Sequence, residues 1–153
     1  ANSMVYVIDD DRAVVALDPD TGEIKKSYQA VRTSDFIIPD KRTLIAAGTD
    51  RVVAYDMVSG TVLWERETQY KPLHSIFGAE NTVFLLSNYT WKPLGMDWFS
   101  SERGRIEAIS LKDGQMLWSR RLKSTISANG STGQSRVSLF TDAGILQVFE
   151  PED

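Results

Sequence analysis

Short apolar runs alternate with short polar turns along the whole chain. The apolar runs are about five residues long and rich in β-branched and aromatic residues, as in Met4 to Ile8 and Thr43 to Ala47, which is typical of strands. Turn-forming Pro, Asp, Asn and Gly residues separate these runs, as in the segment 18–22. No segment of helical length repeats its apolar residues every 3.6 positions. The pattern therefore predicts an all-β chain.

One stretch, Ala54 to Trp64, combines a strand, a polar turn and a second strand that ends in tryptophan. Similar stretches begin at Ala16 and Ala108. Four strands accompany each of the copies at Ala54 and Ala108, and three accompany the copy at Ala16. A period of roughly 40 residues with four strands per period indicates β-propeller blades. We predict four-stranded antiparallel blades, about three and a half of them, in an incomplete or open propeller. One domain, 1–153, would contain blade units at about 4–30, 34–69, 73–123 and 124–153.

The repeated residues have architectural roles. The small Ala lets its strand lie close to the neighbouring sheet, and the Asp and Thr or Ser side chains bond to the backbone of the turn. The Gly adopts a left-handed conformation, and the Trp fills the space between adjacent blades. The predicted structural residues of the repeat are Ala16, Asp18, Gly22, Ala54, Asp56, Gly60, Trp64, Ala108, Gly114 and Trp118.

These residues resemble the tryptophan-docking motif of the PQQ-like β-propeller repeat family. The stretch Ala54 to Trp64 matches the motif fully, whereas the first copy has Lys26 in place of Trp. The third copy has Ser110 in place of Asp and Asp113 in place of Thr. The family includes quinoprotein dehydrogenases and also the non-enzymatic outer-membrane assembly lipoprotein BamB, so the resemblance implies a fold without fixing an activity. A periplasmic or extracytoplasmic location is implied by the resemblance alone.

The first and last units contain three strands each, so the blades of this chain do not complete a ring. Free strand edges and exposed apolar faces invite association with other chains. We therefore expect either a piece of a longer propeller or an assembly, which includes self-association through open blade edges.

Composition excludes several classes of function. The chain has a net charge of −4, which argues against nucleic-acid binding, because nucleic acids require a basic protein surface. No apolar run approaches the roughly 18 residues of a membrane span, so no transmembrane segment is expected. The chain has no Cys and one His, His74, placed on an inner strand as a core or channel-lining residue. Asp9 to Asp11 lacks the ligand spacing of a calcium loop. We therefore expect no catalytic residues, no metal and no cofactor.

The segment Asn88 to Arg103 departs from the repeat and is predicted to be an aromatic loop. Loops that extend from a rigid scaffold concentrate function, and Trp, Tyr and Arg dominate the energetics of interfaces. The alternative is that the loop folds back to cover its own blade or plugs the open arc. The candidate partner-binding residues are Tyr89, Trp91, Trp98, Phe99 and Arg103.

Two further expectations concern the C-terminal part of the chain. Ser124 to Ala128 is predicted to be the first strand of the last unit, and the polar segment 125–135 is predicted to be a flexible loop between blades.

Three functions are compatible with the sequence. The first is a non-enzymatic scaffold that binds a protein or peptide, by strand addition at an edge or through the aromatic loop. The second is a fragment of a PQQ-dependent dehydrogenase, for which the resemblance implies a quinone and calcium. The third is a carbohydrate-binding module in which Trp91 and Trp98 stack on sugar rings.

Overall fold

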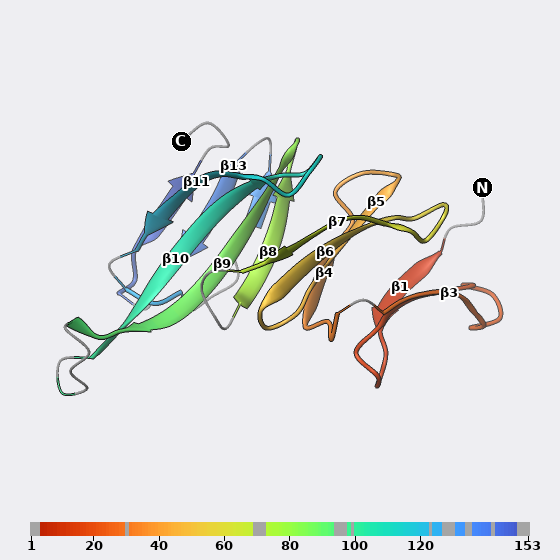
Figure 1. The fold of residues 1–153 in the computed structure, drawn as a ribbon, viewed down its shortest axis with the longest axis horizontal. Helices are drawn as coiled ribbons and strands as arrows, with labels where there is room; N and C mark the ends of the chain where they lie inside the picture. Colours follow the sequence, from red (N-terminus) through yellow and green to blue (C-terminus); the bar gives the residue numbers. More distant parts are fainter. Residues whose placement is uncertain are drawn as a thin grey trace. The chain divides into compact units, whose positions relative to one another are not determined.

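The chain consists of antiparallel sheets joined by turns (Figure 1). The computed structural model describes residues 4–29, 31–68, 73–93, 98, 100–122, 124–126, 131–133, 136–141 and 143–149. These residues contain no α-helix, so the predicted all-β class is confirmed. No helix that could cross a membrane is found in the described part of the chain. The chain divides into two compact units, 1–67 and 68–153.

The first unit contains two sheets. One has the strand order β1-β2-β3, and the other has the order β4-β5-β6-β7. Every neighbouring pair is antiparallel and consecutive in the chain. The strands are β1 (Val5–Ile8), β2 (Val14–Leu17), β3 (Ile24–Tyr28), β4 (Asp35–Ile37), β5 (Thr43–Ala47), β6 (Arg51–Asp56) and β7 (Val62–Glu67).

The second unit also contains two sheets, of four and three strands. Their orders are β11-β10-β9-β8 and β12-β13-β14. The strands are β8 (Leu73–Ala79), β9 (Thr82–Trp91), β10 (Ser101–Ser110), β11 (Met116–Arg121), β12 (Ser131–Gly133), β13 (Arg136–Phe140) and β14 (Leu146–Phe149).

Two C-terminal expectations are wrong. Ser124 to Ala128 does not form a strand in its described part, where Ile126 makes only an isolated bridge to Thr141. The segment 125–135, expected as a loop, contains β12, which pairs with β13. Of the three residues of β12 only Thr132 favours strands, so pairing with β13 rather than local propensity defines this strand.

Each unit has its own apolar core between its two sheets. In the first unit Tyr28 of β3 meets Tyr55 of β6 edge to face, with ring centroids 5.3 Å apart. In the second unit Trp118 of β11 packs against Phe84 of β9 and Phe149 of β14, at centroid distances of 5.9 and 6.1 Å. Trp118 therefore joins two neighbouring sheets through ring contacts.

The repeated Ala and Trp lie opposite each other across one strand pair. Ala54 pairs with Trp64 and Ala108 pairs with Trp118, and a bulge follows each Ala. In the first copy Ala16 pairs with Lys26 and is also followed by a bulge. The small side chain leaves space on the sheet surface beside the large one, so this register is the structural meaning of the motif.

A tight turn sets this register. In the second copy the Gly60 N–H donates to the Asp56 carbonyl at 2.7 Å, and the Asp56 N–H donates to the Thr61 carbonyl at 2.9 Å. Gly60 has a φ of 76°, a left-handed conformation that costs glycine nothing sterically. Gly22 and Gly114 have φ values of 73° and 70° in the corresponding turns.

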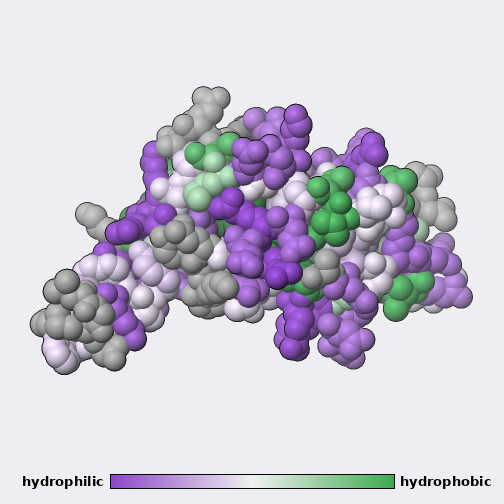
Figure 2. Space-filling view, viewed as in Figure 1, coloured by the Kyte–Doolittle hydropathy of each residue, from purple (hydrophilic) through white to green (hydrophobic). Residues whose placement is uncertain are grey.

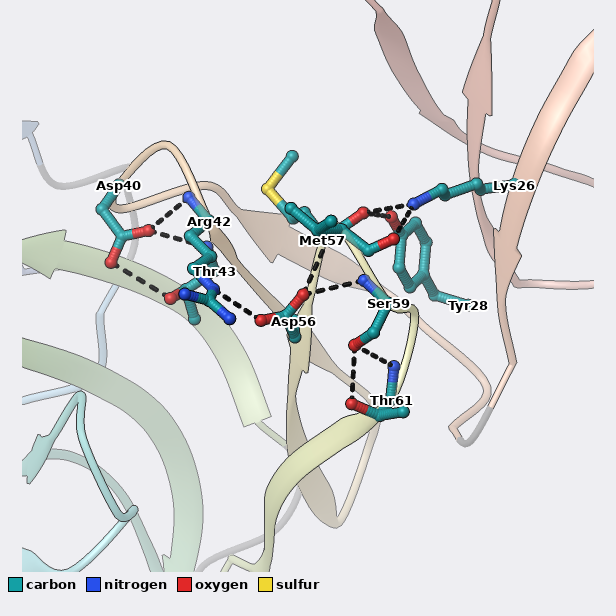
Figure 3. A network of polar contacts seen from close by, with 10 residues as sticks. Lys26, Tyr28, Asp40, Arg42, Thr43, Asp56, Met57, Ser59 and Thr61 are labelled. Atoms are coloured by element: carbon teal, nitrogen blue, oxygen red, sulfur yellow. Dashed lines mark hydrogen bonds and ion pairs between the residues drawn. The ribbon is translucent and has the colours of Figure 1, made fainter.

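The Asp56 carboxylate holds the turn from inside (Figure 3). It is buried and accepts hydrogen bonds from the N–H groups of Ser59 at 2.8 Å and Val58 at 2.9 Å. The Arg42 guanidinium pairs with its other oxygen at 2.6 Å. The Ser59 N–H and the Arg42 side chain are the main causes that hold the pKa of Asp56 well below its ordinary value.

Lys26 replaces the missing Trp with a polar contact. Its ammonium donates to the carbonyls of Met57 and Val58, in the Asp56 to Gly60 turn of the adjacent sheet (Figure 3). The Tyr28 hydroxyl donates to the same Met57 carbonyl at 3.2 Å. The first copy therefore docks on its neighbour through hydrogen bonds instead of an indole ring.

In the third copy the hydroxyl and carboxylate side chains of the turn have changed places. Ser110 replaces Asp, but the backbone bonds are kept, from Gly114 N–H to the Ser110 carbonyl and from Ser110 N–H to the Gln115 carbonyl. Asp113 now supplies the carboxylate. Its pKa is lowered by the Gln115 N–H, at 3.1 Å, and then by the Ser110 side chain. The turn therefore keeps an anionic acceptor at a different position.

Replacing Trp118 with Ala should destabilise the protein by about 3 kcal/mol, because the ring contacts to Phe84 on its own sheet and to Phe149 on the adjacent sheet are lost. Leu117→Ala is the matched control, since Leu117 is 52% exposed on the same strand and should change stability by less than about 0.5 kcal/mol. Denaturant unfolding of both variants measures the difference. Equal stabilities for the two variants would contradict this account of Trp118.

Replacing Asp56 with Asn should lower the melting temperature at neutral pH. The lowered pKa of Asp56 means that the fold favours its carboxylate, so this stabilisation is present above pH 3.8 and is lost as the pH falls below it. The difference in melting temperature between wild type and variant should therefore shrink on acidification from neutral pH to below 3.8. Asp20→Asn, in an exposed turn, is the control. A difference that stays constant with pH would refute this role of Asp56.

Candidate interaction site

The β9–β10 hairpin is the main departure from the repeat. Pairing between these strands continues from Thr82 and Ser110 to Trp91 and Ser101. The neighbouring strands β8 and β11 stop earlier, opposite Ser87 on β9 and Arg105 on β10. The segments 88–91 and 101–104 therefore project beyond their own sheet, as the long green and teal ribbons in Figure 1 show. We call these two segments, with the connection 92–100, the projecting hairpin.

The prediction that 88–103 is a loop is wrong over much of its length. Asn88 to Trp91 and Ser101 to Arg103 are paired strand residues. The alternation of Tyr89, Thr90 and Trp91 is a strand signal, because aromatic and β-branched residues favour strands. The lengthened distance between two repeat positions obscured this signal.

The base of the projecting hairpin is fixed to the chain that leaves β11. The Asn88 side chain donates to the Ile126 carbonyl at 3.0 Å and accepts from the Ile126 N–H at 2.9 Å. Gly104 exchanges backbone hydrogen bonds with Leu122 and Ser124 at 2.9 and 3.0 Å. A Cβ at Gly104 would lie 2.8 Å from the Ser124 carbonyl oxygen, so only glycine fits here. The hairpin is therefore a rigid extension at its base. Sequence patterns do not predict the Asn88 contact, because its partner Ile126 is distant in the chain.

One face of the projecting hairpin carries the aromatic and arginine side chains. Tyr89 lies opposite Arg103, and Trp91 follows on the same face because strand side chains alternate. The Arg103 guanidinium carbon lies 4.1 Å from the centre of the Trp91 ring, a cation–π contact. On the other face Thr90 donates a hydrogen bond to the Glu102 carboxylate at 2.7 Å.

The five predicted contact residues lie as follows. Tyr89 and Trp91 are half-buried on β9, and Arg103 lies on β10. Trp98 is 77% exposed in the connection between the strands. Phe99 lies outside the described residues. The structure thus brings Tyr89, Trp91 and Arg103 together on one face.

The described part of the projecting hairpin has few strongly hydrophobic residues on the surface seen in Figure 2. In Figure 2 its described part is pale to purple, because it carries aromatic and polar rather than aliphatic side chains. Such amphipathic side chains can leave water for a partner while keeping their polar ends hydrogen-bonded.

No metal-binding group is found among the described residues, in which no three His, Cys, Asp or Glu side chains are placed to hold an ion. His74 lies in β8, and its side chain is outside the described part of the structure. The expectation of no metal and no cofactor stays a prediction.

Solved structures with similar folds are distant in sequence. A computationally designed protein, Ika4, has a TM-score of 0.76 at 14% identity, over 98% of this chain and 86% of that one. Hydrazine synthase of Kuenenia stuttgartiensis has a TM-score of 0.69 at 12% identity, over 90% of this chain and 40% of that one. BamB from Moraxella catarrhalis has a TM-score of 0.50 at 16% identity, over 97% of this chain and 58% of that one. These likenesses support the β-propeller fold class.

The comparison with curated proteins found no match. The family model described as outer membrane protein assembly factor BamB, PQQ_2, matches residues 32–149, which is most of the chain. This match confirms the resemblance inferred from the tryptophan-docking residues. The chain therefore belongs to the BamB-like family of PQQ repeat proteins, and its sheets are blades of a β-propeller scaffold.

Proposed function

We propose that this chain is a non-enzymatic scaffold that binds a protein or peptide through the projecting hairpin. The observation that carries the proposal is the face formed by Tyr89, Trp91 and Arg103, which extends beyond its sheet and is followed by the exposed Trp98. The description of the family model as an assembly factor supports a protein as the partner. Because the chain spans 58% of the BamB structure, partners of the whole protein are part of the proposal.

The energetics of the hairpin favour binding. Covering an exposed Trp side chain stabilises a complex by roughly 2–3 kcal/mol. The Arg103–Trp91 contact orders two long side chains before binding, so less conformational entropy is lost when a partner arrives. The two hydrogen bonds between the Asn88 side chain and the Ile126 backbone also restrict the hairpin before binding, because they fix its base.

A carbohydrate partner is the weaker alternative. Sugar rings stack on an open aromatic face, but the Arg103 guanidinium covers one face of Trp91. Trp98, at 77% exposure, is the more exposed of the two tryptophans named for this function.

The test begins with peptides selected from a random display library on the full chain. Trp98→Ala and Arg103→Ala should each weaken binding of the selected peptides at least about tenfold, as expected for interface anchors. Leu117→Ala removes an exposed apolar side chain from the same sheet and is the control, with binding expected within about twofold. Fluorescence anisotropy gives the affinities, and thermal melts show that each variant is folded.

Three outcomes would contradict the proposal. The library could yield no binder, the selected peptides could bind both hairpin variants as tightly as wild type, or a glycan array could give specific binding that Trp98→Ala abolishes. A large drop in melting temperature for Trp98→Ala would favour the alternative that the connection covers its own blade.

A further inference from the structure

The two faces of each sheet can be told apart by the repeat position. This position is held by Ala16 in β2, Ala54 in β6, Ala108 in β10 and Val148 in β14, and each of the four is followed by a large apolar residue. We call the face that carries this residue the front of its sheet, and the opposite face the back. Side chains alternate along a strand, so residues two positions apart lie on the same face.

Within each unit the front of one sheet packs against the back of the next. In the first unit Tyr28, on the front of the β1-β2-β3 sheet, contacts Tyr55, on the back of the β4-β5-β6-β7 sheet. In the second unit Trp118, on the front of the β11-β10-β9-β8 sheet, contacts Phe149, on the back of the β12-β13-β14 sheet. The same kind of contact therefore forms the core of both units.

The front of the β12-β13-β14 sheet is apolar and exposed. Phe140 lies opposite Leu146, and Val148 follows on the same face. Their exposed fractions are 48, 54 and 50%. On the front of the preceding sheet the corresponding pair, Leu86 opposite Ile106, is fully buried in the core of the second unit. The last front therefore has the side chains of a packing face, but no sheet of the described residues covers it.

The back of the β1-β2-β3 sheet is the counterpart of this front. Val5 and Val7 of β1 lie on it, together with Ile24 of β3, and all three are exposed. Val137 and Leu139 hold the positions of Val5 and Val7 on the back of the β12-β13-β14 sheet, where they are fully buried. The chain thus exposes one apolar front and one apolar back, the two kinds of face that pack together inside each unit.

We infer that the chain binds a second copy of itself, with the exposed front of the β12-β13-β14 sheet in one copy against the exposed back of the β1-β2-β3 sheet in the other. The chain's own cores identify this occupant, because in both units an apolar front is covered by an apolar back. Two sheets pack closely face to face through interdigitating side chains. Because two different faces meet, the contact is heterologous. It goes beyond the proposed peptide binding and uses no residue of the projecting hairpin.

The test measures the mass of the full chain by sedimentation equilibrium over about 1–100 µM, a range that brackets moderate affinities. The mass of the wild-type chain should rise with concentration from one copy to at least two. Leu146→Lys on the front and Val7→Glu on the back should each weaken association at least about tenfold, because each places a charge in an apolar contact. Both side chains are exposed, so thermal melts should show that each variant is folded.

Mixing the two variants tests which faces meet. In the mixture the wild-type front of one variant meets the wild-type back of the other, and the remaining contact pairs the new Lys with the new Glu. Opposite charges across an interface favour association. The mixture should therefore associate at least about tenfold more tightly than either variant alone.

Two controls and three contrary results complete the design. Leu117→Lys adds a charge at an exposed apolar position on neither of the two faces, and should leave association within about twofold. Trp98→Ala should also leave it unchanged, so failure of the hairpin proposal is distinguishable from failure of this one. The inference is overturned if the wild-type chain stays a single copy throughout, if Val7→Glu associates as tightly as wild type, or if mixing the variants restores nothing.

Discussion

The structure depends on the register that the glycine turn imposes on the two strands it joins. Glycine at positive φ closes the turn, a bulge follows the alanine, and the residue ten positions after the alanine then lies opposite it. A shift of one residue would move that side chain to the other face of the sheet. The contacts of Trp118 with the neighbouring sheet follow from this register, and so does the position of Lys26.

The copies keep this geometry while changing the residues that satisfy it. In the first copy an ammonium bonded to two carbonyls replaces an indole ring, and in the third the turn carboxylate moves from the first position of the turn to Asp113. Both exchanges keep a side-chain hydrogen bond to the backbone of a turn although the residues differ. The copies of the repeat therefore share the same turn and strand register, although different residues make the contacts in each copy.

Much of the fold could be predicted from the sequence, because strands and turns depend on local chemistry. The turns around Gly22, Gly60 and Gly114 are examples. The sequence analysis misses β12, because pairing with β13 rather than local preference defines it. It also misses the strands of the projecting hairpin, because the break in the repeat spacing obscures their local strand signal. The candidate contact residues were named from aromatic content, whereas the contact of Arg103 with Trp91 depends on the hairpin register.

The central claim is that the tryptophans divide into architectural and contact residues. Trp64 and Trp118 occupy the repeat position, whereas Trp91 and Trp98 lie in the projecting hairpin. The most direct measurement is a two-dimensional nitrogen–proton NMR spectrum, in which each of the four Trp side chains gives one indole N–H signal. During titration with a selected peptide, the signals of Trp91 and Trp98 should shift and those of Trp64 and Trp118 should stay in place. Shifts confined to Trp64 and Trp118 would contradict the account.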